Sequence, residues 1–202
     1  LSGGVDSALV LALASEALGN DQVVPVMMPS PFSSSHSLTD SVELCGNLGI
    51  EPVEIPIHGI FQSFLDATKD SFQGKSFDVA EENIQARIRG ALLMGLCNKH
   101  GLILLNTSNK SELAVGYGTL YGDMAGGLSV IGDLYKTDVY LLCRYLNRNG
   151  VIIPENILTK APSAELRPGQ KDTDSLPEYE ILDSLLFRYI ECQEGPDQIL
   201  KS

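Results

Sequence analysis

The sequence is poor in the residues that hold metal ions or cross-link a chain. It has only four cysteines and three histidines in 202 residues. The cysteines are spread almost evenly with no C-x-x-C pair, and the histidines are equally isolated. This spacing excludes the common kinds of zinc site. It favours reduced thiols, so we expect a cytoplasmic protein.

Positive charge is also scarce, with 14 Lys and Arg residues against 26 Asp and Glu residues and a formal net charge of −12. Nucleic acids and anionic lipid surfaces both reward a basic face, so we expect neither as a partner. The apolar runs are far too short to cross a bilayer, and no signal peptide is visible. The net charge does not exclude a small phosphate-binding site, because local charges and backbone dipoles determine binding there.

Apolar runs rich in β-branched residues alternate with longer helical patterns, which is typical of βαβ units and a parallel sheet. Strands are predicted at 22–28, at 51–57 near a sheet edge because of its two prolines, and at 102–105 in a central, fully buried position. Helices are predicted at 6–18, 39–48, 60–72, 77–99, 135–146 and 178–191. The predicted fold class is therefore α/β, a Rossmann-like doubly wound parallel sheet with helices on both faces.

Two segments are predicted to be loops. Residues 120–132 are rich in glycine and have room for a short strand near Val130. Residues 159–177 carry three prolines and no apolar periodicity, so we expect few buried contacts and a mobile lid that orders over nucleotide phosphates. One domain is expected over 1–202. Because a strand should precede the first motif and the chain begins at Leu1 without Met, we also expect a fragment of a longer protein.

The first motif is a glycine-rich turn between a strand and a helix, Ser2-Gly3-Gly4-Val5-Asp6-Ser7. Paired glycines let the backbone approach a ligand closely, and the helix start offers unpaired amides that suit a phosphate. It is not a Walker A loop, because the lysine is missing. Asp6 makes sense as a Mg²⁺ ligand. The plainer interpretation is a tight turn with Asp6 as a helix cap.

The hexapeptide resembles the pyrophosphate loop of the N-type ATP pyrophosphatases, whose fold is adenine nucleotide alpha hydrolase-like. Residues 106–113 (NTSNKSEL) lead into 116–127 (GYGTLYGDMAGG), and this stretch resembles the core signature of the NAD synthetase family, glutamine-dependent type. Three further segments resemble that family in the family's order: 81–87, 133–137 and 160–166.

The resemblance implies an ATP-dependent ligase that amidates deamido-NAD in two steps. The nicotinate carboxylate attacks the α-phosphorus of ATP and releases pyrophosphate, and ammonia then attacks the adenylated intermediate and releases AMP. The family's glutamine-dependent branch draws ammonia from glutamine through an N-terminal glutaminase domain, which we do not expect in this fragment. The basic C-terminal segment that binds substrate in the family is not visible in this sequence either. The resemblance implies ATP, Mg²⁺, deamido-NAD and ammonia or glutamine as ligands.

Carried over residue by residue, the resemblance assigns the site. The catalytic residues are Asp6 and Lys136, and the metal ligands are Asp6 and Glu112. The residues that bind ATP or pyrophosphate are Ser2, Gly3, Gly4, Val5, Asp6, Ser7, Thr107, Lys136 and Ser163. The residues that bind deamido-NAD are Asn83, Arg87 and Glu112, with the choice between metal and dinucleotide left open for Glu112.

Each assignment has a plainer alternative. Thr107 could be a helix N-cap, Lys136 a solvated surface lysine, and Ser163 an ordinary loop serine. Glu112 could be a first-turn charge favoured by the helix dipole. Arg87 could form an ion pair with Glu82 or Glu81.

Two departures favour the glutamine-dependent branch, since the ammonia-dependent branch has Lys where Leu120 stands and Asp about where Gly127 stands. Rival interpretations are another N-type ATP pyrophosphatase ligase and a non-catalytic ATP-binding module. The helix predicted at 77–99 has apolar residues around much of its circumference, so we expect a homodimer or a higher homo-oligomer.

Overall fold

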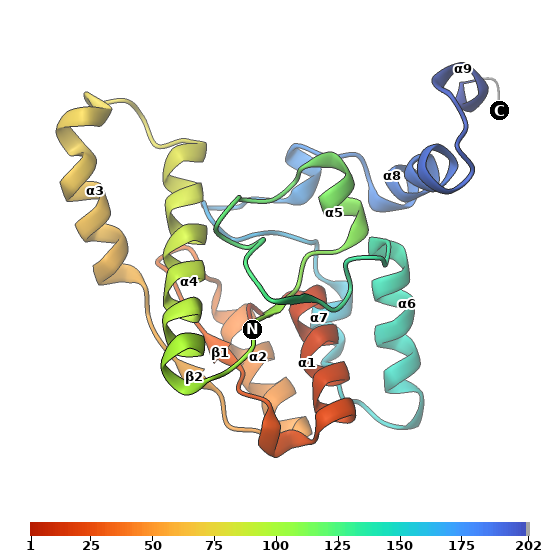
Figure 1. Ribbon diagram of the computed structural model, residues 1–202, viewed down its shortest axis with the longest axis horizontal. Coiled ribbons are helices and arrows are strands. Elements are labelled where there is room, and N and C mark those ends of the chain that lie inside the picture. The colour runs from red at the N-terminus through yellow and green to blue at the C-terminus, as the bar shows by residue number, and fades with distance from the viewer. Residues whose placement is uncertain (201–202) are drawn as a thin grey trace.

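The structure is a computed structural model that describes residues 1–200. Helices are its main regular elements (Figure 1). The helices are α1 (Val5–Leu18), α2 (Ser35–Leu48), α3 (His58–Phe72), α4 (Val79–His100), α5 (Lys110–Val115), α6 (Lys136–Leu146), α7 (Glu155–Thr159), α8 (Tyr179–Leu186) and α9 (Pro196–Ile199). The strands are β1 (Val26–Met27), β2 (Val53–Glu54), β3 (Leu105–Asn106) and β4 (Leu128–Ser129).

The strands pair in parallel, as the α/β prediction requires. In the described chain they form two pairs, β1 with β2 and β3 with β4, and each strand is only two residues long. In the described chain β2 pairs with β1 alone and so lies at an edge, as predicted, and both of its residues are exposed. The predicted central strand at 102–105 is wrong in position: β3 begins at Leu105, and Ile103 is 75% exposed.

The predicted long helices are all present, and their ends follow from capping. Helix α2 begins before the predicted residue 39 because the Ser34 side chain accepts a hydrogen bond from the Ser37 amide. Helix α4 begins with a capping box between Asp78 and Glu81. The segment predicted as one helix at 178–191 is α8 followed by a π-helical turn, and the short helices α5 and α7 were not predicted.

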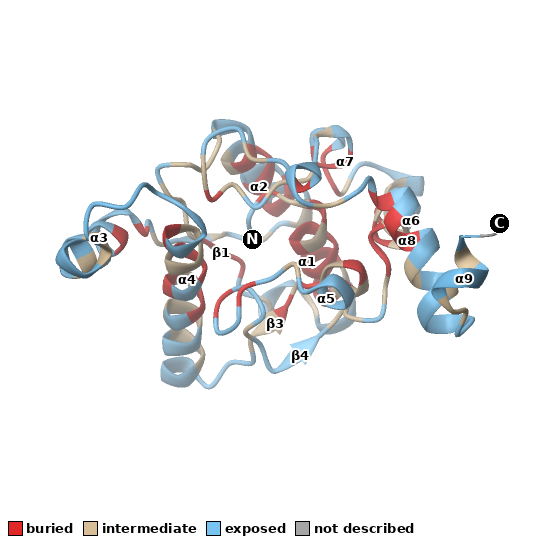
Figure 2. Ribbon diagram, turned by 90° about the horizontal axis from the view of Figure 1, so that it is seen from above, coloured by how far each residue is buried: buried red, intermediate tan, exposed pale blue. Residues whose placement is uncertain are grey.

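The core surrounds α1, which packs against α2, α6 and α7. Most positions of α1 are buried on every side, so it is a central helix and not a surface one (Figure 2). The largest buried apolar side chains of this core are Leu9, Leu44, Ile131, Val139, Ile153 and Ile157. This burial fixes the N-terminal end of α1, where the glycine-rich loop lies.

A smaller cluster of Ile57, Phe61 and Ile88 joins α3 to α4. Helix α3 otherwise lies at one extremity of the molecule, and α9 lies near the other (Figure 1). Within residues 1–200, no helix is long and apolar enough to span a membrane.

Leu9 should be a main source of stability, because its side chain is fully buried between α1 and its neighbours. We expect Leu9→Ala to lower the free energy of unfolding by about 2–5 kcal/mol in urea denaturation. Leu18→Ala on the same helix is the matched control, since Leu18 is 59% exposed. Equal losses in the two variants would contradict the packing described here.

Candidate active site

The glycine-rich loop opens α1 with a hydrogen-bonded frame. The hydroxyl oxygens of Ser2 and Ser7 lie 3.1 Å apart, and the Ser7 hydroxyl donates to the Gly4 carbonyl at 3.1 Å. Gly4 is the N-cap of α1 and provides no side-chain cap. The first-turn amides of α1 therefore have no capping side chain from their own N-cap, which suits an anionic ligand.

Gly3 sets the position of this loop against α2. Its φ is +79°, a left-handed conformation that favours glycine. A Cβ at this position would lie 2.5 Å from the carbonyl oxygen of Ser37, in the first turn of α2. Only glycine fits, so the loop rests directly on the start of α2.

The centre of the site is an ammonium held between two carboxylates. Lys136, the first residue of α6, is 2% exposed. Its Nζ lies 2.5 Å from Asp6 Oδ2 and 3.1 Å from Glu112 Oε1. The side chain of Asn109, which caps α5, donates to Asp6 Oδ1 at 2.8 Å. The structure thus brings together three of the predicted site residues from three helix starts.

Burial and charge shift the pKa values of this cluster. Burial, and then the neighbouring Asp6 carboxylate, raise the pKa of Glu112 to about 7, although Lys136 opposes them. Burial lowers the pKa of Lys136, but the carboxylates of Asp6 and Glu112 outweigh it and raise that pKa above its usual value. Lys136 is therefore charged, and the predicted alternative of a solvated surface lysine is wrong.

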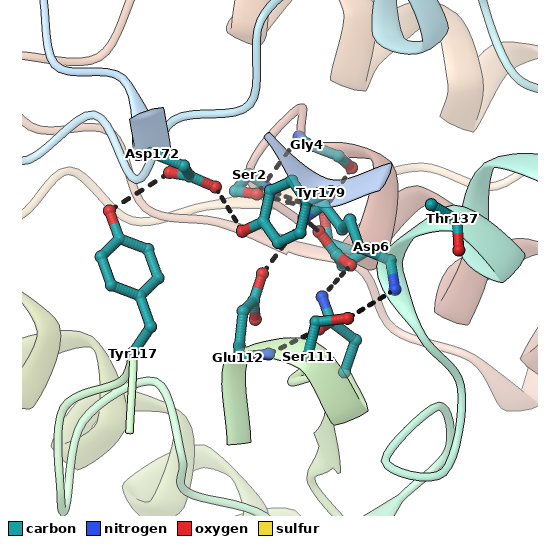
Figure 3. Close-up of polar contacts among 12 residues, drawn as sticks. Ser2, Gly4, Asp6, Ser111, Glu112, Tyr117, Thr137, Asp172 and Tyr179 are labelled. Carbon is teal, nitrogen blue, oxygen red and sulfur yellow. Dashed lines mark hydrogen bonds and ion pairs between the residues drawn. The ribbon is translucent and has the colours of Figure 1, made fainter. Parts of the chain in front are cut away.

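Tyr179 lies beside the cluster, and Asp172 links it to Tyr117 on one side of the site (Figure 3). The Tyr179 ring lies 5.1 Å from Lys136 Nζ. Asp172 is 4% exposed and accepts hydrogen bonds from Tyr179 at 2.8 Å and Tyr117 at 3.3 Å. Burial, and then the Asp172 charge, raise the pKa of both phenols, so they remain donors at neutral pH.

Asn83 and Arg87 lie apart from this ion cluster, on α4. The Thr119 hydroxyl donates to the Asn83 side chain at 2.6 Å, and Arg87 Nε donates to the Leu120 carbonyl at 3.2 Å. The alternative of an ion pair for Arg87 is wrong: Glu82 pairs with Arg167, and Glu81 closes the cap of α4.

Thr107 and Ser163 lie on different loops. Thr107 directly follows β3 and is half-buried, and it is not an N-cap, since α5 is capped by Asn109. The Ser163 hydroxyl accepts a hydrogen bond from the Glu165 amide at 3.1 Å. Nearby Lys160 donates to the Ser37 hydroxyl at 2.9 Å, which places this loop beside the residue that Gly3 contacts.

The segment 159–177 is held in place more firmly than predicted. The Glu165 carboxylate accepts hydrogen bonds from the Ser34 and Ser37 hydroxyls at 2.8 and 2.6 Å. Leu166 and Asp172 are buried. The expectation of few buried contacts is therefore wrong. Glu165 has a left-handed φ of +50°, an uncommon conformation for a residue with a Cβ, and these contacts fix it.

The donor set at the cluster suits a hard divalent cation. In residues 1–200, no group of three or more His, Cys, Asp or Glu side chains is arranged to hold a metal ion. Asp6 and Glu112 nevertheless aim carboxylate oxygens at one shared cation, Lys136, and their side chains are 17% and 18% exposed. Mg²⁺ usually takes only one or two protein carboxylates and completes its shell with water and phosphate oxygens, so these residues fit it.

The two cysteines of the core, Cys45 and Cys143, lack the features of a nucleophile. All four are unpaired, and Cys45 and Cys143 are buried. Burial raises the pKa of Cys143 to about 12, so its thiol stays protonated.

Comparison with known proteins places this geometry in a family. The family model for NAD synthase matches residues 1–202. The chain belongs to the NAD synthase family. It is 55% identical over 202 residues to the glutamine-dependent NAD(+) synthetase of Synechocystis sp. and 55% identical over 201 residues to that of Thermotoga maritima. It covers 36% and 35% of those proteins, so the chain spans about a third of the length of these relatives.

Solved structures of NAD synthases and related enzymes share the fold, which confirms the Rossmann-like α/β prediction. A glutamine-dependent NAD+ synthetase from Acinetobacter baumannii, in complex with ADP, matches with a TM-score of 0.77 at 44% identity, covering 100% of this chain and 36% of that one. An NMN synthetase from Francisella tularensis matches with a TM-score of 0.83 at 31% identity, covering 100% of this chain and 79% of that one.

Sequence reasoning missed several residues that build the site: Asn109, Ser111, Glu165, Asp172, Tyr179 and Asp183. Asn109 and Ser111 lie inside the family signature at 106–113, so the motif itself was the available signal. The others lie in the loop and helix after residue 164. Their contacts span more than 40 residues of sequence or depend on loop conformation, which no local pattern reveals.

Hydrogen exchange tests the prediction that residues 159–177 form a lid. We expect amides of residues 159–177 to exchange faster than those of α1 without nucleotide, because residues 161–171 form no helix or strand whose backbone hydrogen bonds would protect them. Adding ATP and Mg²⁺ should slow them, and Glu165→Ala should speed them in the free protein. Protection equal to that of α1 without ligand, or unchanged by ATP, would contradict a lid.

Proposed function

We propose that this chain catalyses the ATP-dependent amidation of deamido-NAD to NAD, as the synthetase part of a glutamine-dependent NAD synthase. The observation that carries the proposal is the Asp6–Lys136–Glu112 cluster beside the open first turn of α1, in a chain of this family. The 36% share of its relatives supports a longer protein, in which a glutaminase domain outside this chain supplies ammonia. Four unpaired cysteines support a cytoplasmic setting.

The chain's own groups suit the first chemical step. A nicotinate carboxylate oxygen attacks the α-phosphorus of ATP, and the bond to the bridging oxygen breaks as pyrophosphate leaves. Amides and hydroxyls of the Ser2–Ser7 loop hold the phosphates. The Lys136 ammonium stabilises the negative charge that develops on the leaving group. Ammonia then attacks the acyl carbon, and AMP leaves with the bonding electrons while the nitrogen loses a proton.

Asp6 and Glu112 would hold Mg²⁺ together with ATP phosphates. The ion supplies Lewis-acid stabilisation of the pyrophosphate charge. Lys136 keeps both carboxylates in place without the ion, since it neutralises their repulsion. Thr107 and Ser163 are proposed as further ATP contacts: Thr107 follows β3, and Ser163 lies on the loop that Lys160 joins to Ser37.

Deamido-NAD is proposed to extend from the ion cluster toward Asn83 and Arg87 on α4. The support is a chain of polar contacts between these two regions. Tyr179 lies over Lys136 and shares Asp172 with Tyr117, and Tyr117 begins the loop whose Thr119 contacts Asn83. Glu112 lies between the two ends and can serve either the ion or the dinucleotide.

One assay tests the function. The full-length protein is incubated with ATP, Mg²⁺ and ammonium, with and without deamido-NAD, and AMP and NAD are measured. We expect AMP and NAD in equal amounts and only with deamido-NAD. A further reaction contains nicotinate mononucleotide in place of deamido-NAD. AMP formed in that reaction and not with deamido-NAD would indicate that the mononucleotide is the substrate. Bound ATP with no AMP would indicate a non-catalytic module, and AMP formed with neither substrate would indicate another ligase.

Asp6→Asn should abolish Mg²⁺-dependent adenylation, because it removes a metal ligand and one partner of Lys136. The Asp6 side chain is only 17% exposed and pairs with Lys136, so the change also affects stability. We expect a loss of about 1–3 kcal/mol in free energy of unfolding, with the fold retained by circular dichroism. Asp21→Asn, at an exposed turn, is the control. Adenylation near the unaltered rate would refute the metal role.

A homodimer is proposed through α3 and α4. The two helices form an apolar groove of 430 Å³ that includes Ile60, Phe64, Leu92 and Tyr121. Phe64 and Tyr121 are 48% and 84% exposed, which leaves apolar surface for a second copy to cover.

Sedimentation tests the dimer. We expect the unaltered protein to sediment as a dimer at micromolar concentration and Phe64→Glu to sediment as a monomer. Lys69→Glu on the same helix α3 should leave the dimer intact. A monomeric unaltered protein would contradict the proposal.

A further inference from the structure

We propose that α8 positions Lys136 for catalysis through two side chains, Asp183 and Tyr179. They are four residues apart on α8, so they share one face of the helix. Both are buried, and each contacts a different part of the start of α6. Neither is among the residues proposed to bind ATP or deamido-NAD, and both act through Lys136, so both are positioning residues. This inference rests on the proposed function, in which Lys136 acts on ATP.

Asp183 replaces a cap that α6 lacks. The N-cap residue of α6 is Tyr135, whose side chain makes no capping hydrogen bond. Asp183 Oδ2 accepts from the Thr137 amide at 2.8 Å, which satisfies one of the free donors in the first turn. Asp183 is 5% exposed, so this charge-assisted bond is shielded from water.

The same carboxylate also holds α5. Asp183 Oδ1 accepts from the Ser111 hydroxyl at 2.5 Å, and Ser111 Oγ in turn accepts from the Lys136 amide at 2.8 Å. Ser111 is fully buried and precedes Glu112. One carboxylate from α8 thus fixes the starts of the two helices that carry Lys136 and Glu112, and so fixes the distance between those side chains.

Tyr179 controls the other end of the lysine. Its ring lies 5.1 Å from the Lys136 ammonium, within the range of a cation–π interaction. Its hydroxyl donates to Asp172, which fixes the ring (Figure 3). Residues of α8 therefore position both the backbone and the ammonium of Lys136. A displacement of about 1 Å in a catalytic group can cost up to about a hundredfold in rate.

Four variants in the full-length protein test this inference. Tyr179→Leu removes the ring, and Tyr179→Phe keeps it. Asp183→Asn disturbs the bonds to α5 and α6, and Glu180→Gln changes an exposed neighbour on α8 as the control. We expect Tyr179→Leu and Asp183→Asn to lower kcat for AMP formation about tenfold or more, with KM for ATP changed less than about threefold. Glu180→Gln should stay within about threefold of the unaltered kcat, and Tyr179→Phe, which keeps the ring but loses its bond to Asp172, should lower kcat less than Tyr179→Leu does.

Stability is measured on the same samples. A lower melting temperature with unchanged kcat in Tyr179→Leu and Asp183→Asn would show a purely structural role and overturn the inference. If Asp183→Asn does not fold, Ser111→Ala takes its place, because it removes one link while Asp183 keeps its bond to Thr137. Its kcat should fall in the same way, and an unchanged kcat would overturn the inference.

A second measurement needs no activity and separates this inference from the proposed function. Lysines are acylated with an N-hydroxysuccinimide acetate, and the labelling rate of each is read by peptide mass spectrometry. Lys136 should be protected in the unaltered protein and in Glu180→Gln, and should label faster in Tyr179→Leu and Asp183→Asn. Exposed Lys171 is the internal reference. An inactive unaltered protein would reject the proposed function, whereas equal Lys136 labelling in every variant would reject the positioning role.

Discussion

The ammonium of Lys136 is the constraint on which the rest of the site depends. Asp6 and Glu112 come from different helices, and burial together with the nearby Asp6 charge raises the pKa of Glu112. Lys136 opposes this effect, with Nζ 2.5 Å from Asp6 Oδ2 and 3.1 Å from Glu112 Oε1. Removing one member would leave a neighbouring charge without its partner, so the three groups hold one another in place. These ion pairs join the N-terminal ends of α1, α5 and α6 at the site.

Three helix N-termini thus converge at the site. This arrangement explains how an acidic chain can bind an anionic ligand. The chain has a formal net charge of −12, which is unfavourable for a ligand as anionic as ATP. The N-terminal ends of α1, α5 and α6 carry positive partial charge, and the first turn of α1 has no side-chain cap from Gly4. Asp6 and Glu112 lie in the first turns of α1 and α5, where that field favours carboxylates. The local field, and not the total charge, therefore decides whether a phosphate can bind.

What the sequence could predict follows from the range of the interactions involved. Helices such as α1 and α6 follow from apolar spacing and end signals within a few residues, and the glycine-rich loop is recognisable because Gly3 answers a local steric demand. The strand at 102–105 was placed wrongly because an apolar run does not reveal which residues face solvent, and Ile103 does. The tie from Glu165 to Ser34 spans 131 residues, and the tie from Asp183 to Ser111 spans 72. Contacts of that range depend on the finished fold, so single-sequence patterns miss them.

The most direct test of the account is isotope exchange between pyrophosphate and ATP in Lys136→Met, with deamido-NAD present and ammonia and glutamine absent. Exchange reports formation of the adenylated intermediate alone, and methionine keeps the length of the side chain without its charge. We predict that the unaltered full-length protein exchanges label and that the folded variant binds ATP but exchanges at least about a hundredfold more slowly. Exchange at the unaltered rate in the folded variant would contradict the central role of the Lys136 ammonium.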